Sequence, residues 1–168
     1  MTKKKEKIKI IPRLLNLGCG NRKLPKEEGW INIDKDKTCE PDIIRDLDKG
    51  LPFDSNTIDG LYASHVIEHV EDVFFFMYEI WRVCKPNVLI EIIAPDHSFP
   101  SSIWPNHKRD IRPNYFTMWL PNMINPSMNY KTETMGAEFI SINESMIETG
   151  SGIRFILKVV KDENINNR

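Results

Sequence analysis

The feature that most constrains this chain is an apolar run that ends in two closely spaced glycines and is followed by a second apolar run that ends in an acid. Residues 13–17 are predicted to form a buried strand, and Gly18 and Gly20 come directly after it. Glycine adopts positive φ at little cost and lets a ligand contact the backbone. The second predicted strand, Trp30–Asp34, delivers a carboxylate that can accept hydrogen bonds from a ribose diol. Together the two segments predict a nucleotide-type cofactor site.

The spacing after the glycines narrows the choice of cofactor. The dinucleotide fingerprint has a third glycine three residues after the second, and that position is Lys23 here. A cofactor without a pyrophosphate needs only the close backbone approach at Gly18 to Gly20, and S-adenosylmethionine meets that description. A lone Gly-x-Gly also occurs as a simple turn between strands, so the motif alone leaves this alternative open.

Composition predicts one globular domain without a general attraction to nucleic acid or to membranes. The chain has 168 residues and a formal net charge of -1, which gives no general attraction to nucleic acid or to an anionic membrane. Residues 1–12 are expected to be a basic tail, 13–161 a single domain and 162–168 a polar tail. The odd cysteine count without metal-type spacing predicts reduced thiols and a cytoplasmic location. We find neither a run of about 18 apolar residues, which would span a membrane, nor a secretory signal.

Hydrophobic periodicity predicts the remaining elements. Helical spacing of apolar side chains extends from Val70 to Cys84, and Lys85-Pro86 ends it. Residues 87–94 have the unbroken apolar character of a strand buried on both faces. Further strands are expected at 42–45, 57–63, 137–144 and 152–161, a short helix at 115–122 and a hairpin turn at 148–152.

These elements predict an α/β fold with an open, Rossmann-like sheet. The sheet is expected to be mostly parallel, with a C-terminal antiparallel hairpin and reduced helices in the first half. The connection 35–41 has only seven residues, and 21–29 has room for at most two helical turns. Ligands of such sheets bind beyond the carboxyl ends of the strands. Gly18, Gly20, Asp34, Asp46 and the segment 63–65 all follow predicted strands, so they converge on one crevice.

In this combination the chain resembles the class I S-adenosylmethionine-dependent methyltransferases, and more narrowly their small type-11-like branch. The matching segments, in chain order, are LNLGCG (15–20), GWINID (29–34), PDIIRDL (41–47), LPF (51–53), IDGLYASHVIEHV (58–70) and EIWRVCKP (79–86). The resemblance covers about residues 13–97. It departs from the family at Asn87, where glycines usually follow the lysine-proline pair.

The resemblance implies the cofactor contacts. The glycine backbone would face the methionine part of S-adenosyl-L-methionine, Asp34 would bind both ribose hydroxyls, Asp46 and Leu47 would meet the adenine, and Ser64 and His65 would lie beside the methyl group. The implied set is Leu17, Gly18, Cys19, Gly20, Asp34, Lys35, Asp46, Leu47, Ser64 and His65. The first half lacks the full helices of larger members. Because parallel sheets need cover on both faces, a homodimer is a further expectation.

Methyl transfer requires in-line alignment, and a hydroxyl acceptor would also benefit from a general base. The candidate bases are His65, Asp96, His97 and His107, each of which could instead be a hydrogen-bonded structural residue. The expected acceptor is a small molecule or sugar-like hydroxyl. Basic residues between Asn106 and Arg112 could recognise an acidic acceptor or simply be solvated. No Asn-Pro-Pro-Tyr or Asp-Pro-Pro-Tyr motif follows residues 57–63, which disfavours amino-directed nucleic-acid methylation.

Two other functions remain as alternatives. His65-Val66-Ile67-Glu68-His69 matches the His-x-x-Glu-His pattern of inverted zinc proteases, in which a helix lets both histidines share a metal. His65 follows a predicted strand, however, so we prefer the interpretation without a metal and keep a zinc hydrolase as the rival. A non-catalytic S-adenosylmethionine-binding module is the second alternative.

Overall fold

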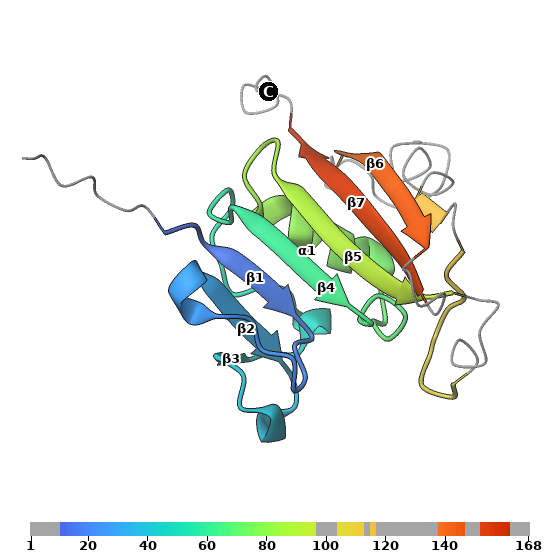
Figure 1. The fold of residues 1–168 in the computed structure, drawn as a ribbon, viewed down its shortest axis with the longest axis horizontal. Helices are drawn as coiled ribbons and strands as arrows, with labels where there is room; N and C mark the ends of the chain where they lie inside the picture. Colours follow the sequence, from blue (N-terminus) through green and yellow to red (C-terminus); the bar gives the residue numbers. More distant parts are fainter. Residues whose placement is uncertain (1–10, 97–103, 113–114, 117–137, 147–151, 162–168) are drawn as a thin grey trace, which may run out of the picture.

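The described part of the chain forms a seven-stranded sheet in the order β3-β2-β1-β4-β5-β7-β6 (Figure 1). The computed structural model describes residues 11–96, 104–112, 115–116, 138–146 and 152–161. The strands are β1 (Leu14–Leu17), β2 (Trp30–Asp34), β3 (Ile43–Ile44), β4 (Gly60–Ser64), β5 (Leu89–Pro95), β6 (Glu138–Met146) and β7 (Gly152–Val160). The predicted fold class is therefore confirmed.

Strand direction determines where a ligand can bind. The first five strands pair in parallel, and β7 pairs antiparallel with both β5 and β6. From β1 the chain proceeds outward to β2 and β3 and then crosses to β4 on the other side of β1. Strand order thus reverses between β1 and β4, and the carboxyl ends of these two strands form the switch point at which ligands of open α/β sheets bind.

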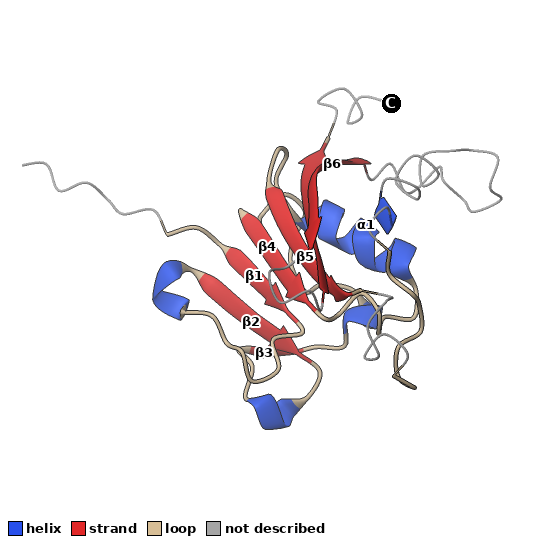
Figure 2. Cartoon of the chain, turned by 45° about the vertical axis from the view of Figure 1, so that its right-hand side comes forward, coloured by secondary structure: helices blue, strands red, loops and turns tan. Residues whose placement is uncertain are grey.

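The helix α1 (Val73–Val83) covers one face of the sheet, and this face is the core (Figure 2). Its inward side chains, which include Phe76, Met77 and Ile80, pack with alternate residues of the strands. The helix begins at 73 rather than at 70 because the Asp72 carboxylate caps it, accepting from the backbone N–H groups of Phe74 and Phe75 at 2.9 and 3.1 Å.

The short connections of the first half form single 3₁₀ turns. They are Lys26–Glu28 after Pro25, Lys37–Cys39 and Leu47–Lys49. The reduced helices expected there are thus observed. Asn87 adopts a left-handed φ of 65°, a conformation that asparagine tolerates better than most residues, so the departure from the glycine pattern preserves the turn before β5.

The opposite face of the sheet is covered by no α-helix of the described segments (Figure 1). A row of side chains from neighbouring strands crosses this open face: Asn16, Tyr62, Glu91 and Ile156. The prediction that the strand over 87–94 is buried on both faces is wrong. Ile90, Ile92 and Ala94 are buried against the core, but Leu89 is 53% exposed and Glu91 is partly exposed, because nothing in the described chain covers their side.

Several predictions fall outside the described residues. These are the structure of the basic tail up to residue 10, His97, most of the expected helix at 115–122, the turn at 148–152 and the tail from 162. The three cysteines are free thiols, as expected. None of the described helices has the length and apolar character that a bilayer crossing requires.

The loop between β3 and β4 is fixed to α1 by a nearly buried ion pair. Glu79 accepts from Arg82 Nε at 2.6 Å and from the Leu51 backbone N–H at 2.7 Å, and Arg82 also donates to the carbonyl oxygens of Leu51 and Phe53. The hydrogen bond from Arg82 holds the pKa of the Glu79 carboxyl below its ordinary value of 4.5, against the effect of burial. This pair therefore positions the loop that precedes β4.

We expect Glu79→Ala to lower the free energy of unfolding by about 3 kcal/mol, because Arg82 would be left without its countercharge in a mostly buried position. Urea unfolding followed by circular dichroism measures this change. Lys85→Ala, which removes the half-exposed pair with Asp59, should cost less than about 1 kcal/mol. The difference between parent and Glu79→Ala should be fully present above pH 4.5 and shrink as the pH falls through the lower, folded-state pKa. Equal losses in the two variants would contradict this interpretation.

The open face gives the expected homodimer a concrete test. If a second copy covers it, light scattering should give twice the 19.6 kDa mass of the chain. Leu89→Glu places a charge on the exposed apolar part of this face and should return the protein to a monomer. A monomeric parent at working concentration would overturn the prediction.

Candidate cofactor and active site

The turn after β1 exposes bare backbone at the switch point. Gly18 and Gly20 have φ of 60° and 48°, the left-handed region that favours glycine. A Cβ on Gly18 would lie 2.4 Å from Val66 Cγ2, whereas a Cβ on Gly20 would meet no atom within 4 Å. Gly18 therefore permits close packing against the segment after β4, and Gly20 faces open space.

Asp34, at the end of β2, lies beside this turn. Its Oδ2 accepts from the Gly20 backbone N–H at 2.8 Å, and its Oδ1 accepts from the Asp36 backbone N–H at 2.9 Å. The carboxylate is thus held in place by backbone donors. Because two carboxylate oxygens offer about four acceptor positions, it retains capacity for further donors. The predicted arrangement of an acid next to the glycine turn is present in the structure.

A cavity of about 440 Å³ adjoins this acid. Six of the residues implied to contact the cofactor line it: Gly18, Asp34, Lys35, Asp46, Leu47 and His65. Asp46 and Leu47 come from the 3₁₀ turn after β3, where the Asp46 carboxylate caps the turn by accepting from the Asp48 N–H at 3.2 Å. The volume lies within the range typical of small-molecule sites.

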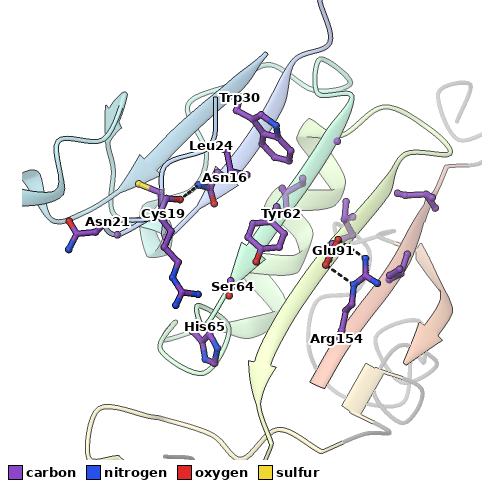
Figure 3. Close-up of a pocket in the computed structure, with 18 residues that line it drawn as sticks. Asn16, Cys19, Asn21, Leu24, Trp30, Tyr62, Ser64, His65, Glu91 and Arg154 are labelled. Atoms are coloured by element: carbon purple, nitrogen blue, oxygen red, sulfur yellow. Dashed lines mark hydrogen bonds and ion pairs between the residues drawn. The ribbon is translucent and has the colours of Figure 1, made fainter. Parts of the chain in front are cut away.

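A second cavity, of about 890 Å³, lies on the open face of the sheet (Figure 3). Tyr62 and Ser64 of β4 contribute to it, together with Trp30 of β2. Glu91 and Arg154 face each other across β5 and β7, with Arg154 Nε 2.6 Å from Glu91 Oε1. The wider cavity thus combines two aromatic rings with one ion pair.

The two cavities share Gly18 and His65 among their lining residues. His65 follows β4 with an unusual positive φ of 55°, and its backbone N–H donates to Ile93 O at 2.8 Å, which fixes this conformation. Its half-exposed side chain lies at the end of the strand, beside Ser64 (Figure 3). His65 is therefore the candidate base that borders both cavities.

The other candidate bases lie elsewhere. Asp96, at the end of β5, is only 3% exposed and lines neither cavity, and His97 is outside the described residues. His107 also lines neither; its ring packs edge-on against His69 with centroids 4.7 Å apart. The structure thus brings one of the three described candidates to a cavity wall.

The remaining implied cofactor residues are divided between the core and the wider cavity. Leu17 is fully buried and lines neither cavity, whereas Cys19, Gly20 and Ser64 line the wider one. Burial raises the pKa of the Cys19 thiol, and the neighbouring Asp34 carboxylate raises it further. The thiol therefore stays protonated at neutral pH and is not an activated nucleophile.

The helix that an inverted zinc protease needs is absent from the His65–His69 motif. Residues 67–69 form a turn and α1 begins only at Val73, so the two histidines do not occupy successive turns of one helix. The basic residues near Asn106 are also used internally: Arg109 donates to the carbonyl oxygens of Ile67 and Glu71. These bonds fix the segment 104–112 against the turn after β4.

Sequence reasoning missed several lining residues. In the smaller cavity they include Arg45 and His69, and in the wider one Asn16, Tyr62, Glu91 and Arg154, whereas Asn106 and Lys108 belong to the basic segment that was predicted to contact an acceptor. The period-2 alternation of β4 and β5 could have indicated that Tyr62 and Glu91 share a face. No local pattern could have placed residues 106 and 108 in the same cavity as Asp34.

Comparisons with known proteins agree with this geometry. A family model described as a methyltransferase domain matches residues 26–92. A SAM-dependent methyltransferase from Aquifex aeolicus superposes with a TM-score of 0.66 at 14% identity, over 89% of this chain and 82% of that one. A SAM-dependent methyltransferase from Archaeoglobus fulgidus gives 0.61 at 19%, over 88% and 86%. The [4+2]-cyclase SpnF gives 0.64 at 12%, over 89% and 74%. No curated protein matches the chain by sequence.

The structural similarities show the fold, and the cyclase illustrates that a fold alone does not determine a reaction. The family match is specific to the segment that supplies Asp34, Asp46 and His65. Residues 26–92 therefore match a methyltransferase domain, and together with the fold this supports a class I methyltransferase of the type-11 branch, with S-adenosyl-L-methionine as its cofactor.

Proposed function

We propose that the protein transfers a methyl group to a hydroxyl of a small, sugar-like molecule. The adenosine part of the cofactor would occupy the smaller cavity, and the acceptor would occupy the wider one. The observation that carries this proposal is that Gly18 and His65 belong to the walls of both cavities. A group transferred between two bound molecules must pass through such a junction.

The residues around the smaller cavity fit the cofactor. Asp34 is held by the Gly20 and Asp36 N–H groups and can accept from ribose hydroxyls. Leu47 supplies an apolar contact and Asp46 a polar one for the adenine. The bare backbone at Gly18 and Gly20 leaves room for the methionine part. When bound there, the cofactor supplies an activated methyl group, so the protein has mainly to align it with the acceptor.

The wider cavity favours a hydroxyl-rich acceptor. Trp30 and Tyr62 offer aromatic contact area, and the paired side chains of Glu91 and Arg154 offer a hydrogen-bond acceptor and donors without net charge. Pockets of this kind bind by apolar contact and use a few polar groups for orientation. With its formal net charge of -1, the chain provides no general attraction to nucleic acid.

His65 is the proposed general base. Its Nδ1 lies 3.3 Å from Glu68 Oε1, so its Nε2 points away from that carboxylate. Nε2 could take the proton of an acceptor hydroxyl at the junction of the cavities. Base catalysis of this kind contributes about 10²–10⁴ in rate.

The function is tested by S-adenosylhomocysteine binding and methyl transfer measured on the same variants. At 100 times its Kd the ligand should raise Tm by roughly 5–10 °C. Asp34→Ala should abolish this shift, whereas Asp54→Ala, at an exposed aspartate outside both cavities, should retain it. His65→Ala should keep the shift and lose about 10²–10⁴ in transfer to a panel of sugar and phenol hydroxyls, measured as S-adenosylhomocysteine formed.

A retained shift in Asp34→Ala would overturn the ribose assignment. Binding by the parent without transfer to any hydroxyl would overturn the acceptor class and favour a non-catalytic binding module. Unchanged transfer by His65→Ala would remove its role as the base.

The two glycines allow a matched comparison within one turn. Gly18→Ala should abolish the thermal shift, because its Cβ would collide with the stiff Val66 side chain and displace a wall of both cavities. Gly20→Ala has a similar positive φ but no atom within 4 Å of the new Cβ, so it should bind more weakly yet measurably. Isothermal titration with S-adenosylhomocysteine compares the two. Equal affinities would contradict the proposed packing of the cofactor against Gly18.

A further inference from the structure

One fully buried acid in the described chain lacks the partners that its charge requires. Glu68 has no exposed area, and neither carboxylate oxygen receives a hydrogen bond; its nearest side-chain nitrogen is His65 Nδ1, 3.3 Å from Oε1. Glu79, which is also buried, accepts from Arg82 and from the Leu51 backbone N–H. An unpaired carboxylate away from water is costly, because nothing replaces the hydration it loses. The surroundings of Glu68 are therefore suited to a cation.

Two histidines complete a cluster around this acid. Glu68, His69 and His107 each offer a ligand atom, and these atoms all lie within 4.8 Å of one another. The nearby cationic side chains in the described residues are directed elsewhere: Lys108 pairs with Glu71, and Arg109 donates to the carbonyl oxygens of Ile67 and Glu71. No arginine or lysine of this region thus neutralises Glu68.

The orientation of His69 is that of a metal ligand. Its Nδ1 lies 3.1 Å from the Asn106 carbonyl oxygen, which only accepts, so Nδ1 carries the hydrogen. In the neutral ring the lone pair is then on Nε2, which lies 4.0 Å from Glu68 Oε1. Two electron-rich atoms face each other at a distance too long for a hydrogen bond. Metal-binding histidines commonly donate their second ring N–H to a backbone carbonyl in this way.

We propose that Glu68, His69 and His107 bind a divalent transition-metal ion, for which zinc is the best fit. Two imidazoles and one carboxylate form the ligand set of catalytic zinc sites that keep an open position. Magnesium and calcium prefer all-oxygen ligands and are disfavoured here. The helical protease motif is not needed, because His107, from a distant part of the chain, takes the place of His65, the first motif histidine.

The ion would fasten the segment 104–109 to the turn after β4. Lys108 already donates its backbone N–H to Glu68 O at 2.8 Å, so a hydrogen bond joins the two segments. His69, Asn106 and Lys108 line the smaller cavity. A metal bound between the segments would therefore hold a wall of the cofactor cavity in place. This coupling to the cofactor rests on the proposed function, whereas metal binding itself does not.

Metal titration of the full chain, stripped with a chelator, tests the site directly. We expect one zinc ion per chain by calorimetry, and cobalt(II) should give the visible absorption of a low-coordinate site. Glu68→Gln and His107→Ala should each weaken zinc binding by more than about 100-fold, beyond the 10–100-fold effect of losing an outer-shell partner. Glu28→Gln makes the same chemical change at an exposed residue at the opposite end of the strands and should bind as the parent does.

Thermal unfolding measured without metal shows whether the Glu68→Gln variant still folds. Glu68→Gln removes a buried charge that receives no hydrogen bond, so its Tm should not fall below that of the parent. A folded Glu68→Gln protein that binds zinc as tightly as the parent would overturn the site. Failure of the parent to take up zinc or cobalt would do the same.

The coupling between the metal site and the cofactor cavity is tested by a separate measurement. Zinc should tighten S-adenosylhomocysteine binding at least about fivefold, and the ligand should tighten zinc binding by the same factor. Stoichiometric zinc uptake without this effect would overturn the coupling alone. Loss of the ligand response in Asp34→Ala reports on the cofactor site separately, so the two failures are distinguishable.

Discussion

The hydrogen bond from the Gly20 N–H to the Asp34 carboxylate is the contact on which the site depends. It joins the turn after β1 to the end of β2 at 2.8 Å, beside the point between β1 and β4 at which the strand order reverses. The bond forms only because Gly18 and Gly20 take left-handed φ, which brings the amide toward the neighbouring strand. One interaction therefore orients the acid and keeps the adjoining backbone free of side chains.

The chain forms this site with little helical structure. Three 3₁₀ turns replace longer helices in the described first half, and α1 covers a single face of the sheet. The uncovered face carries Tyr62, Glu91 and Arg154 and forms the larger cavity. Because few helices cover the sheet, one of its faces stays open beside the cofactor cavity. His65 lies at the boundary between the two cavities.

The turn after β4 carries two side chains, His65 and Glu68, that point in different directions and have different proposed roles. His65 is turned toward the cavities by its positive φ, whereas Glu68 is directed into the interior. Such a buried acid is tolerated only if something compensates its charge. The segment 104–109 brings His107 and the Asn106 carbonyl to it, so the proposed metal site depends on a contact between parts of the chain about forty residues apart.

The sequence by itself determined the fold class, the strand bounds within a few residues and the convergence of Gly18, Asp34, Asp46 and His65, because local periodicity and strand ends specify them. It did not determine which face of β5 is covered, so Leu89 was wrongly expected to be buried. It indicated that the basic residues between Asn106 and Arg112 could contact a ligand, but it gave no reason to unite Glu68 with His107. That contact follows from where a long connection returns to the sheet, and only the tertiary structure decides that return.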